Sequence, residues 1–306
     1  MNIVLCSLWN DVDFCPDING LAVESVCRLI TTQLFNEAAD SDIGRILIAR
    51  YEQMRGNFRD VHFNDGRWNL PNFNGCVCTS TAQKPDARLK VPQQYFNRHA
   101  GWFDYDNLGH DLPVWFCKDG HETGRRIMIV SVDPKRTGDI SGALYLGTPF
   151  GFHSHDYRCS TRTDNINLLV MNLINDGAVV YLTDIAKLYA TDRECKIDIG
   201  EDGLNVKGEC ENIIENEIDA FDPELIITLG NDVTDRRCFH TNLNSVEGAR
   251  NGLCIQQSKV RDRIDAIAAY HPNPRRRQRI YLGRYGTLED YYEALYSEIR
   301  RWMDER

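Results

Sequence analysis

The sequence predicts an α/β fold: a central, mostly parallel four-stranded sheet with helices on both faces, preceded by an N-terminal elaboration. Four short apolar runs are typical of buried strands, and they occupy residues 127–132, 178–182, 225–229 and 266–270. Helical patterns separate these runs. Strands that alternate with helices form parallel sheets that are covered on both sides, which is why we expect this architecture.

Three helices are predicted around this sheet. Residues 164–174 and 210–221 carry apolar side chains at spacings of three and four, which places them on one face of a helix. Residues 288–302 form a strongly amphipathic pattern with the same spacing. We expect this last helix to pack against the sheet.

The first part of the chain is less regular. Residues 2–5 have the pattern of a strand and residues 21–37 that of a helix. Residues 57–119 are rich in Asn, Gly, Asp and aromatic side chains, so we expect mostly loops there. We divide the chain into an elaboration at 1–124, packed on the core, and an α/β core at 125–306.

Composition sets the class of protein. The chain has 42% hydrophobic and 26% charged residues, lacks the pattern of a signal peptide and has no apolar run of about 18 residues, so we expect a cytoplasmic protein without membrane contact. Its 11 cysteines are then expected to be mostly reduced. The net charge of -10 argues against polyanion binding over the whole surface, although five arginines gather within residues 275–284.

Polar residues follow each predicted strand. In parallel sheets, ligands bind beyond the carboxyl ends of the strands, so these residues are the candidates for a site. Two carboxylates and one imidazole should therefore meet at one edge. The segments are Asp133-Pro134-Lys135, Thr183-Asp184, Gly230-Asn231-Asp232 and His271-Pro272-Asn273-Pro274.

Four of these segments together resemble the uracil-DNA glycosylase superfamily. Residues 130–134 (Val-Ser-Val-Asp-Pro) look like its first signature, and residues 271–274 (His-Pro-Asn-Pro) look like its second. Residues 180–187 are similar to the strand that carries the base-reading Asn, and residues 217–230 to a helix–strand–Gly segment. The resemblance spans roughly residues 125 to 285, with the motifs in the family's order.

The resemblance implies a DNA glycosylase that hydrolyses the N-glycosidic bond of a flipped-out base. Cleavage develops positive charge on the sugar and negative charge on the base, so Asp133 would stabilise the cation and orient water while His271 donates a hydrogen bond to the base. Phe150 resembles the family's stacking platform, with Phe152 as the second candidate. The alternatives are a turn residue at 133, a loop residue at 271 and core aromatics at 150 and 152.

Two departures from the family concern the substrate. Asp184 stands where uracil enzymes have the base-reading Asn, and a carboxylate accepts hydrogen bonds, as the amino group of cytosine requires. Lys135 stands where a Tyr excludes groups on the pyrimidine C5 atom, so it leaves room there. We therefore expect a C5-modified cytosine, hydroxymethylated or glucosylated, in phage DNA, and a role in antiviral defence.

The predicted DNA contacts follow the second signature. The family usually has an apolar wedge there, whereas this chain has Arg275, Arg276 and Arg277 beside Asn273. Arginines can bind phosphates and stack in the gap that a flipped base leaves. The alternative is a solvated basic loop.

The sequence also contains candidate metal ligands. Some superfamily members bind an iron-sulfur cluster, one ligand of which lies in a Lys-Cys-Arg-Pro segment; here residues 187–189 are Lys-Leu-Tyr, so we expect no cluster. Cys76, Cys78, Cys117 and His121 could supply a structural zinc site, with ordinary core thiols as the alternative. No organic cofactor is required for the reaction.

Three other functions stay open. One is a uracil-DNA glycosylase in base-excision repair. Another is a catalytically silent module that binds modified bases, although the retention of Asp133 and His271 counts against it. The third is a nucleoside or nucleotide hydrolase, for which the basic segment at 275–284 would be superfluous.

Overall fold

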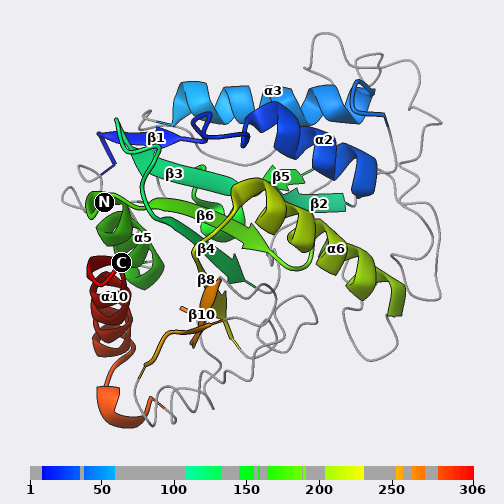
Figure 1. The fold of residues 1–306 in the computed structure, drawn as a ribbon. Coiled ribbons are helices and arrows are strands. Elements are labelled where there is room, and N and C mark those ends of the chain that lie inside the picture. Colours follow the sequence, from blue (N-terminus) through cyan, green and yellow to red (C-terminus); the bar gives the residue numbers. More distant parts are fainter. Residues whose placement is uncertain are drawn as a thin grey trace.

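The structure is a computed structural model in which two β-sheets are flanked by helices (Figure 1). It describes residues 9–34, 38–58, 108–131, 145–154, 158, 164–187, 189–190, 204–230, 253–257, 264–272 and 282–306. The larger sheet has seven strands in the order β1-β3-β6-β4-β8-β10-β9, and the smaller has the order β5-β2-β7. Structural statements below concern these residues only.

The four predicted strands form the centre of the larger sheet. In spatial order they are β6 (Val179–Asp184), β4 (Arg126–Ser131), β8 (Leu225–Leu229) and β10 (Asp265–Ala269), and every neighbouring pair is parallel. Nearly all of their side chains are buried, because helices cover both faces. The prediction of a central parallel sheet is confirmed.

The prediction of four strands was wrong, because antiparallel strands extend the sheet at both edges. β1 (Val12–Phe14) and β3 (Val114–Lys118) lie beyond β6, and β9 (Gln256–Gln257) lies beyond β10. β3 falls in the segment that was expected to be mostly loop, as does β2 (Leu108–Asp111). The Val-Trp-Phe-Cys run of β3 is short, and the polar residues around it obscured its pattern.

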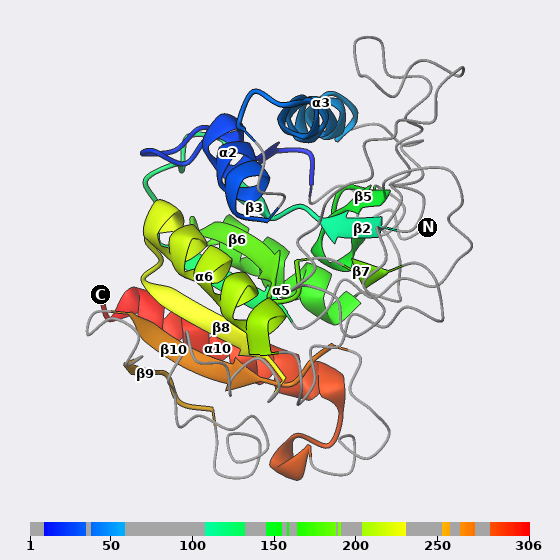
Figure 2. The ribbon, with the colours of Figure 1, turned by 90° about the vertical axis from the view of Figure 1, so that its right-hand side faces the viewer.

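The helices lie on two sides of the large sheet. Figure 2 shows α6 (Leu204–Phe221) in front of the sheet and α10 (Leu288–Asp304) behind it. α2 (Val23–Gln33) and α3 (Asp42–Asn57) lie on the side of α6, and α5 (Asp164–Asn175) packs against α10. Helices at 21–37, 164–174, 210–221 and 288–302 were predicted, whereas α3 was not. The strand predicted at 2–5 lies outside the described residues.

Aromatic side chains join the N-terminal segments to the sheet. On the side of α6, Trp115 of β3 stacks on Tyr181 of β6 with ring centroids 5.9 Å apart, and Tyr181 stacks on Phe221 at 4.9 Å. On the other side, Trp9 packs edge-on against Phe116 at 5.4 Å. These contacts make β1 and β3 part of the same hydrophobic core as the parallel strands. Among the described helices, none is both long enough and apolar enough to cross a bilayer.

Candidate active site

Strand pairing brings two of the predicted segments together at the carboxyl edge of the sheet. Ser131, the last residue of β4, is the register partner of Asp184, the last residue of β6. The Ile185 amide also donates a hydrogen bond to the Ser131 carbonyl, with a nitrogen–oxygen distance of 2.9 Å. Asp133 itself lies outside the described residues, but it follows Ser131 by two positions. The carboxyl ends of β4 and β6 therefore lie side by side at Ser131 and Asp184.

Asp184 is almost fully buried, with 3% of its surface exposed. Because alternate side chains of a strand point to opposite faces, Thr183 faces α6 while Asp184 faces away from it. A buried carboxylate at the end of a parallel strand can accept hydrogen bonds from a ligand that enters this edge.

A buried polar network joins residues 183–187, here called the Asp184 turn, to α6. Sequence patterns did not predict this network. The Lys187 ammonium donates to Thr183 Oγ1 at 2.5 Å and to the two Glu217 carboxylate oxygens at 2.8 and 2.9 Å. Thr183 Oγ1 in turn donates to Glu217 Oε2 at 2.9 Å. Burial raises the pKa of the Glu217 carboxyl, while the neighbouring Lys187 opposes that rise. The network ties both ends of the Asp184 turn to α6.

His110 holds the same turn from the other sheet. Its Nδ1 atom is hydrogen-bonded to the Lys187 carbonyl, and burial lowers the pKa of the imidazole to about 3. The ring is therefore neutral at pH 7, and Nδ1 acts as the donor. β2, which carries His110, pairs with β7 (Tyr189–Ala190) on one side and with β5 (Tyr145–Gly147) on the other. The small sheet thus connects the Asp184 turn to the segment that leads to Phe150.

His271 follows β10 at the same edge and is half-buried. Its ring centroid lies 5.6 Å from that of Phe150, with an angle of 36° between the ring planes. The preceding residue, Tyr270, is held through its backbone by Tyr291 and Tyr292 of α10. The structure thus brings together an imidazole and an aromatic ring that are 121 positions apart in the sequence (271 minus 150).

Phe150 has an unusual backbone conformation. It lies within the 3-10 turn Pro149–Gly151 with φ 55° and ψ 11°, in the left-handed region that bulky side chains rarely adopt. Such strain persists where the surroundings enforce it, and it is common at functional sites. Here Thr148 Oγ1 accepts from the His153 amide at 3.0 Å, and Arg158 donates to the Phe152 carbonyl at 2.6 Å. The enforced turn leaves the Phe150 ring partly exposed.

Phe152 occupies a different environment from Phe150. It is 1% exposed, and its ring packs against Trp9 at 5.6 Å and Phe116 at 5.7 Å. It also contacts Phe150 edge-on at 6.5 Å. Of the two predicted platform residues, Phe150 is therefore the one whose ring is accessible, and Phe152 supports it from the core.

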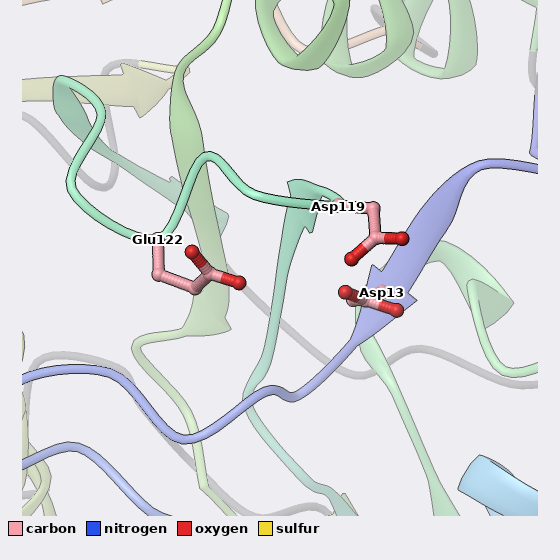
Figure 3. A group of neighbouring side chains, drawn as sticks. All are labelled: Asp13, Asp119 and Glu122. Atoms are coloured by element: carbon pink, nitrogen blue, oxygen red, sulfur yellow. The ribbon is translucent and has the colours of Figure 1, made fainter.

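The predicted zinc ligands Cys117 and His121 lie at the opposite edge of the sheet. β3 runs antiparallel to β6, so its carboxyl end, with Cys117, is far from the carboxyl edge of the parallel strands. Figure 3 shows the carboxylates of Asp13, Asp119 and Glu122 at this end. One oxygen atom of each lies within 4.8 Å of one oxygen atom of the other two. Burial and these three carboxylates raise the pKa of the Cys117 thiol to about 12. A metal at this edge would be remote from the candidate site.

The remaining predicted site residues lie outside the described part of the chain, and their roles stay predictions. Besides Asp133, they are Lys135, Asn273, Arg275, Arg276, Arg277, Cys76 and Cys78.

A sheet that gathers a carboxylate, an imidazole and a partly exposed aromatic ring at the carboxyl edge of its parallel strands is suited to hold a flat heterocyclic base. Residues 117–295, more than half of the chain, match the Uracil DNA glycosylase superfamily, and the chain belongs to this superfamily. Members of the superfamily are generally hydrolases that act on DNA. No curated protein sequence matches the chain.

Proposed function

We propose that the protein is a cytoplasmic DNA glycosylase that hydrolyses the N-glycosidic bond of a C5-modified cytosine in phage DNA and leaves an abasic site. The observation that carries this proposal is the pairing of Ser131, which precedes Asp133 by two positions, with Asp184, a buried carboxylate in place of the usual amide. Membership of the superfamily supports the reaction class.

In the proposed reaction, one side chain stabilises the positive charge that develops on the sugar and another stabilises the negative charge that develops on the base. Asp133 stabilises the positive charge that develops at C1′ of the sugar and orients the attacking water. The C1′–N1 bond breaks, its electron pair leaves with the base, and the water oxygen bonds to C1′ while its proton is released. His271 donates a hydrogen bond to the departing base, which accumulates negative charge. Phe150, 5.6 Å from the His271 ring, replaces part of the stacking that the base loses when it leaves the duplex.

Asp184 supplies the preference for cytosine. An ionised carboxylate only accepts hydrogen bonds, so it fits the exocyclic amino group of cytosine and opposes the carbonyl oxygen at the same position of uracil. Its burial strengthens this discrimination, because an unmatched polar contact costs more in a site that excludes water. Lys135 in place of a bulky Tyr leaves space for a substituent on C5. Such an enzyme spares unmodified cytosine only if the substituent contributes to binding.

The proposal is tested by base release from defined duplexes. Wild-type protein and Asp133→Ala are incubated with duplexes that contain uracil, cytosine, 5-hydroxymethylcytosine or its glucosylated form, and released bases and abasic sites are quantified by mass spectrometry. We expect release of a modified cytosine that depends on Asp133. Release of uracil alone would instead establish a repair enzyme, and no release from any duplex would establish a silent binding module.

A further inference from the structure

The backbone of Tyr270, the residue before His271, is held from two sides by tyrosine hydroxyls of α10. The Tyr270 amide donates to Tyr291 Oη at 3.1 Å, and Tyr292 Oη donates to the Tyr270 carbonyl at 2.7 Å. Tyr270 lies just past the last strand residue, Ala269, where the ladder to β8 ends. Two side chains thus continue the hydrogen bonding of the strand for one more residue.

The hydroxyls keep their protons in this position. Tyr291 and Tyr292 are both nearly or fully buried, and burial raises the pKa of each phenol above its usual value. A protonated Tyr292 can donate to the carbonyl throughout the physiological pH range. The Tyr291 ring packs against Tyr270 at 5.1 Å and Tyr285 at 5.3 Å, and it contacts the Tyr292 ring at 5.8 Å.

α10 is tied to the other end of β10 as well. Trp302 Nε1 donates to the Asp265 carboxylate at 2.6 Å, and Asp265 is the first residue of β10. From residue 292 to residue 302 the helix rises roughly 15 Å, and from residue 265 to residue 270 an extended strand covers roughly 17 Å. The two spacings match. α10 is therefore tied to both ends of the segment from Asp265 to Tyr270, the residue that precedes His271.

We propose that Tyr291 and Tyr292 are positioning residues that set the orientation of His271 for the departing base. This inference rests on the proposed glycosylase function, because it assigns the two tyrosines to the same reaction. Neither hydroxyl contacts the base; both act through the Tyr270 backbone. A loop anchored by two buried hydrogen bonds keeps the imidazole beside Phe150, where a shift of about 1 Å is enough to cost about a hundredfold in rate.

The test removes the hydroxyls and leaves the rings. Tyr291→Phe, Tyr292→Phe and the double variant are compared with Tyr296→Phe, which removes a hydroxyl of the same helix that donates to Asp176 on the surface. We expect the double variant to release base about ten- to a hundredfold more slowly in single turnovers, with DNA affinity within about twofold of wild type. Tyr296→Phe should match wild type. A double variant with the wild-type rate would overturn the proposal.

A double-mutant cycle separates positioning from a loss of stability. His271→Ala is combined with Tyr291→Phe/Tyr292→Phe, and single-turnover rates are measured well below each melting temperature. If the tyrosines act through His271, their substitution has no further effect beyond about twofold in the His271→Ala background. Multiplicative losses would show that the tyrosines act elsewhere and would overturn the proposal. The single Phe variants provide the same comparison if the double variant does not fold.

A second readout does not depend on activity. The ring resonances of His271 are followed by NMR across a pH titration in wild type, in the Phe double variant and in Tyr296→Phe. We expect the His271 titration to change in the Phe double variant and to stay as in wild type in Tyr296→Phe. If wild-type protein releases no base, the proposed function fails, but this comparison still decides whether Tyr291 and Tyr292 orient His271. An unchanged His271 titration overturns the positioning role alone.

Discussion

Lys187 and Glu217 form an ion pair with a nitrogen–oxygen distance of 2.8 Å, and both side chains are almost completely excluded from solvent. Within the described part of the chain, the Lys187 ammonium and the Glu217 carboxylate are also each hydrogen-bonded to Thr183 Oγ1. Removing one partner leaves the other charge buried, whereas replacing both with apolar side chains leaves no buried charge between α6 and the segment that follows β6.

We therefore predict that Lys187→Met lowers the free energy of unfolding by about 3–5 kcal/mol and that Lys187→Met/Glu217→Leu recovers most of that loss. Urea denaturation at pH 7 measures both. The control is Arg125→Met, which breaks the partly exposed pair with Glu224 at the amino edge of the sheet and should cost less than about 1 kcal/mol. A Lys187→Met protein as stable as the control variant would contradict the prediction.

The stability of the protein should fall in mild acid because of His110. Its pKa is about 3 in the folded protein, against about 6.5 in an unfolded chain. Because the folded pKa is the lower one, the unfolded chain binds a proton between these values and the folded protein does not. The stabilisation is complete above pH 6.5 and is lost as the pH falls toward 3.

The measurement is the free energy of unfolding of wild type and His110→Gln between pH 7 and pH 4. Wild type should lose up to about 1.4 kcal/mol more per pH unit than the variant. Carboxylates titrate equally in both proteins, so the difference isolates His110. Parallel curves would show that the buried imidazole does not govern this range.

Phe150 and Phe152 should differ in what their removal affects. Stacking of a base on an aromatic ring contributes about 1–3 kcal/mol, so Phe150→Ala should slow base release by about five- to 150-fold, with little change in stability. Phe152→Ala should lower the free energy of unfolding by about 3–5 kcal/mol, because its ring fills the core beside Trp9 and Phe116. Urea denaturation and single-turnover rates separate the two effects; a Phe150→Ala variant with the wild-type rate would remove Phe150 as the platform.

The predicted zinc site gives a prediction of metal content. If Cys76, Cys78, Cys117 and His121 bind zinc, purified protein should contain about one zinc per chain, and Cys117→Ser should lose it. Inductively coupled plasma mass spectrometry measures the content. Base release should be unaffected by a chelator, since Cys117 and His121 lie at the edge opposite the site. Protein that is expressed in zinc-supplemented medium and contains no zinc after purification would refute the site.

The central strands and the edge of the site could be predicted from sequence, because their signals lie in short contiguous stretches of the chain. Each central strand is a contiguous apolar run, and parallel order places whatever follows those runs at one edge, so Asp184 and His271 were found without knowledge of packing. β3 could not be separated from its polar surroundings, and α3 carries charged residues around much of its circumference. Their places depend on tertiary contacts such as the stacking of Trp115 on Tyr181.

The supporting groups of the site could not be predicted, because they meet only in the folded chain. Lys187 and Glu217 are 30 positions apart and become partners only once α6 packs over β6. The contacts of Tyr291 and Tyr292 with the Tyr270 backbone likewise depend on how α10 is aligned with β10. In the sequence, these tyrosines are only the apolar face of an amphipathic helix.

The most direct test of the account is the choice of base made by residue 184. Wild type and Asp184→Asn are each given an equimolar mixture of duplexes containing 5-hydroxymethylcytosine or uracil, and the ratio of released bases is measured by mass spectrometry. The variant keeps the size of the side chain but gains a donor that matches the uracil carbonyl. We predict that wild type releases mainly the modified cytosine and that Asp184→Asn shifts the ratio toward uracil by at least about tenfold. An unchanged ratio, or a wild-type preference for uracil, would contradict the account.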